Sequence, residues 1–395
     1  MTSTPSRNCL QIPVLGTGGT ISCTHSPEGD LVPTLTCADI VRQAHVPQGF
    51  EALPHDIMSI DSSSITLPQI DQLVAHIARF YSPTPAGIVV LHGTDTMEES
   101  ALAAACALEL PCPVVFTGAQ RPGDDAAPDG PANLSRAFAA LASGELSPDV
   151  HIVFGDAILP ARGAYKAHTT AETAFRNALA DSGKEAPSPG SAGTGSGSEE
   201  TEPEPASAPT PPRIAGLNVP IVTTFAGDDG LLIRALRERD GAGSDRDGAV
   251  PDRDGAVHGL VLAAMGSGNI PTAVAAELSA WRADRSAQAG ELPVVVCSRV
   301  PTGGVSFVYG GSGGGAQLAR DGLRSAPARR GSNCSTKSPA AASAPCPALA
   351  RLTPPPARPD PSPSCPMDPR GLGPRRQSGR CGSSPGRSRR SRNAR

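Results

Sequence analysis

The sequence predicts an α/β protein with a larger, doubly wound, mainly parallel-sheet N-terminal domain and a smaller α/β C-terminal domain. Two observations lead to this prediction. Short apolar segments of strand length alternate with longer segments of helical pattern, and glycine-rich or polar turns follow several of the apolar segments. The length of 395 residues suggests about two domains and is sufficient to bury a large core.

The first apolar segment, residues 12–15, predicts a buried parallel strand that ends in the glycine turn at 16–20. Three glycines in four positions allow a sharp turn and a close approach of a ligand to the backbone. Ligands bind at the carboxyl ends of strands in such sheets, so Thr20 is a candidate nucleophile. The alternative is a phosphate-binding loop, but Ile21 replaces the third glycine of the dinucleotide fingerprint and no P-loop lysine follows.

Later segments continue the alternation of strands and helices. In the N-terminal part, we predict strands at 57–60, 87–91, 114–117 and 151–154, helices at 38–44, 66–80, 96–110 and 132–142, and a mobile polar loop at 24–36. In the C-terminal part, we predict strands at 219–223, 258–264 and 294–296, and helices near 229–238 and 271–286. Thr66 with Gln69, and Thr96 with Glu99, have the spacing of capping boxes that begin two of these helices.

A second polar motif follows the predicted strand at 87–91. Thr94 and Asp95 lie between the end of this strand and the beginning of a predicted helix. Backbone N–H groups and the helix dipole at such a position favour a bound carboxylate. We expect Thr96 to act only as the helix cap, which leaves Thr94 and Asp95 as candidate site residues.

Two segments differ from this pattern in composition. Residues 182–212 contain no Ile, Leu, Val, Met, Phe, Tyr or Trp, which predicts a disordered insert between domains at 1–181 and 213–323. Residues 324–395 predict a disordered basic tail, because no Val, Ile or Phe follows Val308. A change of reading frame in a GC-rich gene would explain this tail, and a basic arm that binds nucleic acid is the alternative.

Charge and cysteine content limit the classes of function. Residues 331–395 carry a net charge of +10, so the remainder carries −14 of the total of −4, which argues against nucleic-acid binding by the folded part. No apolar segment has transmembrane length, and the N-terminus shows no signal-peptide pattern. None of the ten cysteines forms a C-x-x-C pair, so we expect free thiols in a cytoplasmic protein.

These motifs resemble the bacterial-type L-asparaginase/glutaminase family. The resemblance rests on Thr-Gly-Gly-Thr-Ile at 17–21 and His-Gly-Thr-Asp-Thr-Met-Glu-Glu at 92–99, with further matches at 118–122, 129–134, 166–170, 266–269 and 298–303. It implies an amidohydrolase without cofactor or metal that converts L-asparagine to L-aspartate and ammonia. It also implies a homo-oligomer built as a dimer of dimers. The alternatives are a glutaminase, a related amidase, and a non-catalytic amino-acid-binding relative.

The resemblance implies a role for each catalytic residue. Thr20 is expected to attack the side-chain amide carbon, and Thr94, Asp95 and Lys166 to form a second hydroxyl–amine–carboxylate group. An alcohol needs a base to become an effective nucleophile, and a lysine kept partly neutral by burial can serve. Without the resemblance, Lys166 would be interpreted as an ordinary surface lysine. Residues 21–36 hold no tyrosine, whereas members of the family have one beside the nucleophile.

The same resemblance implies how the substrate is held. Asp95, next to Thr94, is expected to accept the α-ammonium group of the amino acid. Ser62 is expected to contact the α-carboxylate because it follows the predicted strand at 57–60. Ser63 is the neighbouring alternative for that contact.

Overall fold

The structure is a computed structural model that describes residues 9–81, 85–179, 213–241, 256–288 and 290–325. The predicted insert at 182–212 lies outside the described residues, and so does the predicted tail from residue 326 onward. In the described part of the chain, no helix combines the length and apolar character needed to cross a membrane. The cytoplasmic location stays a prediction.

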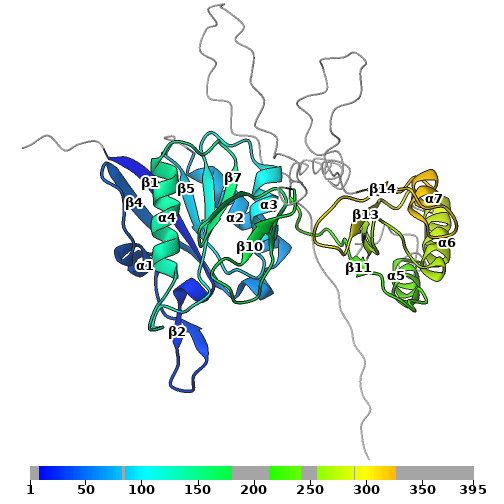
Figure 1. The fold of residues 1–395 in the computed structure, drawn as a ribbon, viewed down its shortest axis with the longest axis horizontal. Helices are drawn as coiled ribbons and strands as arrows, with labels where there is room; N and C mark the ends of the chain where they lie inside the picture. Colours follow the sequence, from blue (N-terminus) through cyan, green and yellow to red (C-terminus); the bar gives the residue numbers. More distant parts are fainter. Residues whose placement is uncertain (1–8, 82–84, 180–212, 242–255, 289, 326–395) are drawn as a thin grey trace, which may run out of the picture. The chain divides into compact units, whose positions relative to one another are not determined.

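The N-terminal domain is built on a six-stranded sheet in the order β4-β1-β5-β6-β7-β8 (Figure 1). The strands are β1 (Leu10–Gly18), β4 (Phe50–Ile60), β5 (Ile88–Leu91), β6 (Val114–Thr117), β7 (Val150–Phe154) and β8 (Ala157–Pro160). All neighbours in this sheet are parallel except β7 and β8, which are antiparallel. The predicted doubly wound, mainly parallel sheet is confirmed, although β4 begins seven residues before the predicted strand at 57–60.

Helices cover both faces of this sheet (Figure 1). Those on one face are α2 (Leu67–Arg79) and α3 (Met97–Ala107), and those on the other are α1 (Cys37–Gln43) and α4 (Gly130–Ala142). Alternate side chains of a strand point to opposite faces, so Val90 packs in the core with α2 and α3 while Val89 packs in the core with α1 and α4. Burial on both faces explains why β5, β6 and β7 are continuous apolar segments.

The two predicted capping boxes have different outcomes. At the start of α2 the prediction is confirmed, because the Thr66 backbone N–H donates to Gln69 Oε1 at 2.9 Å in a reciprocal box. At the start of α3 it is wrong, because Thr96 makes no side-chain capping bond. Its hydroxyl instead donates to the backbone oxygen of Ser62 at 2.8 Å. Thr96 therefore joins the loop after β5 to the loop after β4.

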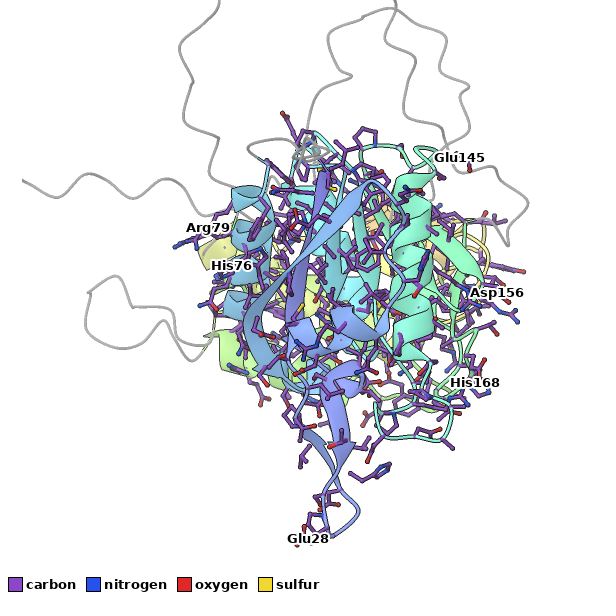
Figure 2. The ribbon with its side chains drawn as sticks, turned by 90° about the vertical axis from the view of Figure 1, so that its left-hand side faces the viewer. Glu28, His76, Arg79, Glu145, Asp156 and His168 are labelled. Carbon is purple, nitrogen blue, oxygen red and sulfur yellow. The ribbon has the colours of Figure 1, made fainter. Side chains whose placement is uncertain are left out.

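The predicted loop at 24–36 contains an antiparallel hairpin. Its strands are β2 (Cys23–His25) and β3 (Leu31–Pro33). Glu28 lies at the tip of the hairpin, which projects from the domain (Figure 2). At the end of β2 nearest the tip, the His25 backbone N–H donates to Asp124 Oδ2 at 2.9 Å, and the His25 ring lies 3.1 Å from Asp124 Oδ1. The segment after Thr20 is therefore attached to the loop after β6.

The C-terminal domain has a four-stranded parallel sheet in the order β11-β12-β13-β14. The strands are β11 (Ile221–Thr223), β12 (Leu260–Ala264), β13 (Val294–Ser298) and β14 (Arg324–Ser325), and the helices are α5 (Leu231–Gly241), α6 (Thr272–Gln288) and α7 (Gly315–Arg320). The core between them surrounds the buried Trp281. Because β14 pairs with β13, the first two residues of the predicted tail belong to this sheet.

The carboxylate of Asp240, whose side chain is 3% exposed, joins α5 to α6. It accepts hydrogen bonds from Trp281 Nε1 at 2.9 Å, Arg285 Nη1 at 2.8 Å and the Val257 backbone N–H at 3.0 Å. Burial acts to raise the pKa of Asp240, but these hydrogen bonds and the charge of Arg285 together hold it below its ordinary value. The resulting stabilisation is present above the ordinary pKa of 3.8 and is lost as the pH falls through the lower folded-state pKa.

We expect Asp240→Ala to lower the free energy of unfolding of this domain by about 3 kcal/mol, measured by urea denaturation. The reason is that Arg285 and the Trp281 N–H lose their shared acceptor in a largely buried place. The control is Asp284→Ala, because Asp284 is 48% exposed and pairs with Arg237 near the surface. That pair should contribute about 1 kcal/mol or less. Equal effects of the two substitutions would contradict the assigned role of Asp240.

Candidate active site

Three glycines bring the ends of β1, β4 and β5 into backbone contact at the carboxyl edge of the N-terminal sheet. A Cβ on Gly18 would lie 2.5 Å from the Ile60 oxygen, and one on Gly19 would lie 2.4 Å from Gly93 Cα. A Cβ on Gly93 would lie 2.5 Å from Ser62 Oγ. Gly18 and Gly19 also have φ angles of 106° and 83°, which glycine adopts without strain. The glycine turn is therefore required for the close approach of three separate loops.

Thr20 follows this contact directly, as the first residue of the 3₁₀ helix η1 (Thr20–Ser22). The neighbouring hydroxyls are already bonded: Thr17 donates to the Leu91 oxygen at 2.9 Å and Ser22 to the Gly19 oxygen at 2.8 Å. Among the described residues, the half-buried Thr20 hydroxyl has no hydrogen-bond partner. Its hydroxyl is thus free to meet a substrate at the carboxyl edge of the sheet.

Lys166 lies far along the chain, at the end of β9 (Ala164–Lys166), yet it reaches the motif after β5. Its amine donates to Thr94 Oγ1 at 2.8 Å and to Asp95 Oδ1 at 2.6 Å. Thr94 is buried, the Lys166 side chain is 16% exposed and the Asp95 side chain is 57% exposed. Hydroxyl, amine and carboxylate therefore form one connected group that runs from the protein interior to an accessible carboxylate. Lys166 is not an ordinary surface lysine.

The composition contains a further signal for Lys166. Only three of the 34 basic residues are lysines, namely Lys166, Lys184 and Lys337, and Lys166 is the only one that the structure describes. Arginine keeps its proton in proteins, whereas a lysine amine can release it. Lys166 can therefore exchange a proton at this position, which an arginine could not do.

The two candidate serines have different surroundings. Ser62 is buried at the start of the 3₁₀ helix η2 (Ser62–Ser64), where its Oγ accepts the Asp95 backbone N–H at 3.3 Å. The proton of the Ser62 hydroxyl is thereby left to donate to a ligand. Ser63 is exposed, and its backbone N–H donates to Asp61 Oδ1 at 3.0 Å. The structure joins Ser62 to the Thr94–Asp95 loop and leaves Ser63 outside this hydrogen-bonded group.

His92 begins the same motif but has a structural role. It is 1% exposed, and its Nδ1 lies 2.7 Å from the Gly93 oxygen, which can only accept, so Nδ1 carries the proton. Burial lowers the pKa of His92, so the ring is neutral at pH 7 and fixes the Gly93 peptide. Within the residues that the structure describes, no three or more His, Cys, Asp or Glu side chains are arranged to hold a metal ion.

Comparison with known proteins identifies the family. Residues 11–184 match the asparaginase N-terminal domain, and residues 218–337 match the glutaminase/asparaginase C-terminal domain. A probable L-asparaginase of Deinococcus radiodurans is 30% identical over 319 residues, which cover 79% of this chain and 86% of the relative. The chain belongs to the asparaginase family. This confirms the resemblance drawn from the motifs at 17–21 and 92–99, and with it the expected class of enzyme.

Two further proteins similar to this asparaginase-family chain are a glutaminase-asparaginase and an L-asparaginase of solved structure. A glutaminase-asparaginase of Acinetobacter glutaminasificans is 33% identical over 111 residues, which cover 28% of this chain and 34% of that protein. The solved structure of the thermostable L-asparaginase from Thermococcus kodakarensis has the same fold, with a TM-score of 0.60, 23% identity and coverage of 80% of this chain and 87% of that one.

The C-terminal family match continues to residue 337, beyond the boundary at 323 that composition predicts.

The glycine contacts lead to a test of the site geometry. Gly93→Ala is expected to separate the loops after β1, β4 and β5, because its Cβ would lie 2.5 Å from Ser62 Oγ and 2.7 Å from Ser62 Cβ. We expect a loss of about 1–3 kcal/mol in unfolding free energy, measured by urea denaturation, together with weaker amino-acid binding in calorimetry. Gly310→Ala is the matched control, since a Cβ at Gly310 meets open space. Unchanged binding in Gly93→Ala would show that this contact does not shape the site.

Proposed function

We propose that this asparaginase-family protein hydrolyses the side-chain amide of L-asparagine to L-aspartate and ammonia, with Thr20 as the nucleophile. The observation that carries the proposal is the Lys166 amine, bonded at 2.8 Å to the Thr94 hydroxyl and at 2.6 Å to the Asp95 carboxylate. The close approach of Gly19 to Gly93 supports a position for Thr20 beside this group. The probable L-asparaginase of Deinococcus radiodurans supports L-asparagine as the substrate.

The reaction proceeds in two steps that share the same groups. The Thr20 hydroxyl oxygen attacks the amide carbon, the amide nitrogen takes up a proton, and ammonia leaves an ester on Thr20. Water then attacks that ester, which releases aspartate and restores the Thr20 hydroxyl. Lys166 and the Thr94 hydroxyl move the protons in both steps, and Asp95 orients the Lys166 amine.

The same loops supply groups for the α-amino acid part of the substrate. The exposed Asp95 carboxylate accepts the α-ammonium group, because the second oxygen of this carboxylate is not used by Lys166. The Ser62 hydroxyl donates to the α-carboxylate, with Ser63 as the alternative donor. Separate contacts to the two charged groups would leave the side-chain amide at Thr20. The dimer of dimers that the family resemblance implies remains part of this proposal, with each site completed by a partner subunit.

L-Glutamine is the second candidate substrate, and it is favoured by the match of residues 218–337 to the glutaminase/asparaginase C-terminal domain. The test is ammonia release by the purified full-length chain from L-asparagine and from L-glutamine. We expect a higher kcat/KM for L-asparagine. A higher kcat/KM for L-glutamine would show that L-glutamine is the preferred substrate. Binding of L-aspartate in calorimetry without ammonia release would instead support a non-catalytic amino-acid-binding relative.

A further inference from the structure

The backbone of Lys166 is held by a side chain that the proposed mechanism does not use. The Lys166 backbone N–H donates to Oε2 of Glu98, in the first turn of α3. Thr94 and Asp95, which accept hydrogen bonds from the Lys166 amine, precede Glu98 by four and three residues. One short stretch of chain therefore contacts Lys166 both at its backbone and at the end of its side chain.

The pairing of β9 shows why Glu98 is needed as an acceptor. β9 pairs with β10 (Phe175–Asn177) in an antiparallel sheet of two strands, with Lys166 opposite Phe175. The Ala167 backbone N–H donates to the Ala174 oxygen, and the Ala178 N–H donates to the Gly163 oxygen. Hydrogen-bonded and non-hydrogen-bonded pairs alternate along an antiparallel ladder, so Lys166 lies in a non-hydrogen-bonded pair. The Lys166 N–H consequently points away from β10 and finds its partner in Glu98.

We propose that Glu98 is a positioning residue that fixes the backbone of Lys166 and thereby keeps its amine between Thr94 and Asp95. A lysine side chain has four rotatable carbon–carbon bonds, so a small displacement of its backbone moves the amine out of hydrogen-bond reach of either acceptor. The inference deepens the proposed function, on which its kinetic part rests.

A carboxylate in the first turn of a helix also has a simpler explanation, since it interacts favourably with the helix dipole. Glu99 occupies the same turn, so it shares any contribution of the dipole. Burial raises the pKa of both carboxyls, but the Lys166 N–H bond and the charge of the Lys166 amine oppose this rise at Glu98. The contact with Lys166 is therefore specific to Glu98, and Glu99→Ala is the matched control for the dipole.

The experiment compares Glu98→Ala, Glu98→Gln, Glu98→Asp and Glu99→Ala in the full-length chain with two readouts. The first is kcat and KM for ammonia release from L-asparagine. The second is the rate at which trinitrobenzenesulfonate modifies Lys166 without substrate, followed by mass spectrometry of the peptide that contains Lys166. The second readout requires no enzymatic activity.

For Glu98→Ala we expect kcat to fall about tenfold or more with KM changed less than about threefold, and Lys166 to be modified about fivefold faster. Glu98→Gln keeps an acceptor oxygen at the same reach and should stay within about threefold of wild type in both readouts. Glu98→Asp keeps the charge but withdraws the oxygen by one methylene, so it should resemble Glu98→Ala. It also tests the proposal if Glu98→Ala does not fold.

The proposal is overturned if Glu98→Asp matches wild type in both readouts, or if Glu99→Ala has the same effects as Glu98→Ala. A wild-type chain that releases no ammonia would instead overturn the proposed function. In that case the modification rate of Lys166 still decides whether Glu98 holds it, so the two failures are distinguishable.

Discussion

Thr20→Ala is expected to lower ammonia release from L-asparagine by about a thousandfold or more, because no other group would form the ester intermediate. The fold should be unaffected. Within the described residues the Thr20 hydroxyl makes no hydrogen bond, so its removal leaves no buried polar group without a partner. Steady-state ammonia assays and a thermal melt of the same preparation measure the two effects separately.

Thr20→Ser is the control, because it retains the hydroxyl and removes only a methyl group. It should keep measurable turnover and form an ester that mass spectrometry can detect after a rapid quench with acid. Thr17→Ala tests the neighbouring hydroxyl, which already donates to the Leu91 oxygen. This substitution should lower the melting temperature more than it lowers turnover. Turnover of Thr20→Ala within about tenfold of wild type would contradict the assignment of the nucleophile.

The sheet could be predicted because its signals are local. β5, β6 and β7 are short, continuous apolar segments, and such segments are typical of strands with helices on both faces. The glycine turn could also be predicted, because the positive φ of Gly19 requires glycine and the turn marks the end of β1. Once the sheet is parallel, the carboxyl ends of β1 and β5 lie at one edge, which places Thr20 and Thr94 in the same region.

Contacts between distant segments could not be predicted in this way. The spacing of Thr96 and Glu99 fits a capping box, but the carbonyl of Ser62 competes for the Thr96 hydroxyl through a contact that no local pattern encodes. The β2–β3 hairpin could not be predicted from a local pattern either, because its strands have only three residues each and His25 is bonded to Asp124, 99 residues further along the chain. Glu98 belongs to the motif at 92–99, but its bond to Lys166 becomes visible only with the position of β9.

Lys166→Met is the second substitution with a large expected effect, a fall of about 10²–10⁴-fold in kcat. Methionine matches the unbranched lysine chain as far as its ε-carbon but lacks the amine that joins the Thr94 hydroxyl to Asp95. Binding of L-aspartate in calorimetry should change far less than kcat, because the charged groups of the ligand are assigned to Asp95 and Ser62. The unfolding free energy should fall by about 1–3 kcal/mol, because the buried Thr94 hydroxyl loses its partner. Asp95 contributes little to this loss, since it is 57% exposed and becomes solvated.

Lys166→Arg separates the positive charge of this residue from its ability to exchange a proton. Arginine keeps a cation beside Asp95, but its guanidinium group does not release a proton in the working pH range. If Lys166 moves protons between Thr94 and the substrate, Lys166→Arg should be nearly as inactive as Lys166→Met. If Lys166→Arg instead retains turnover within about tenfold of wild type, the positive charge alone is sufficient, and the proton must reach Thr94 by another route.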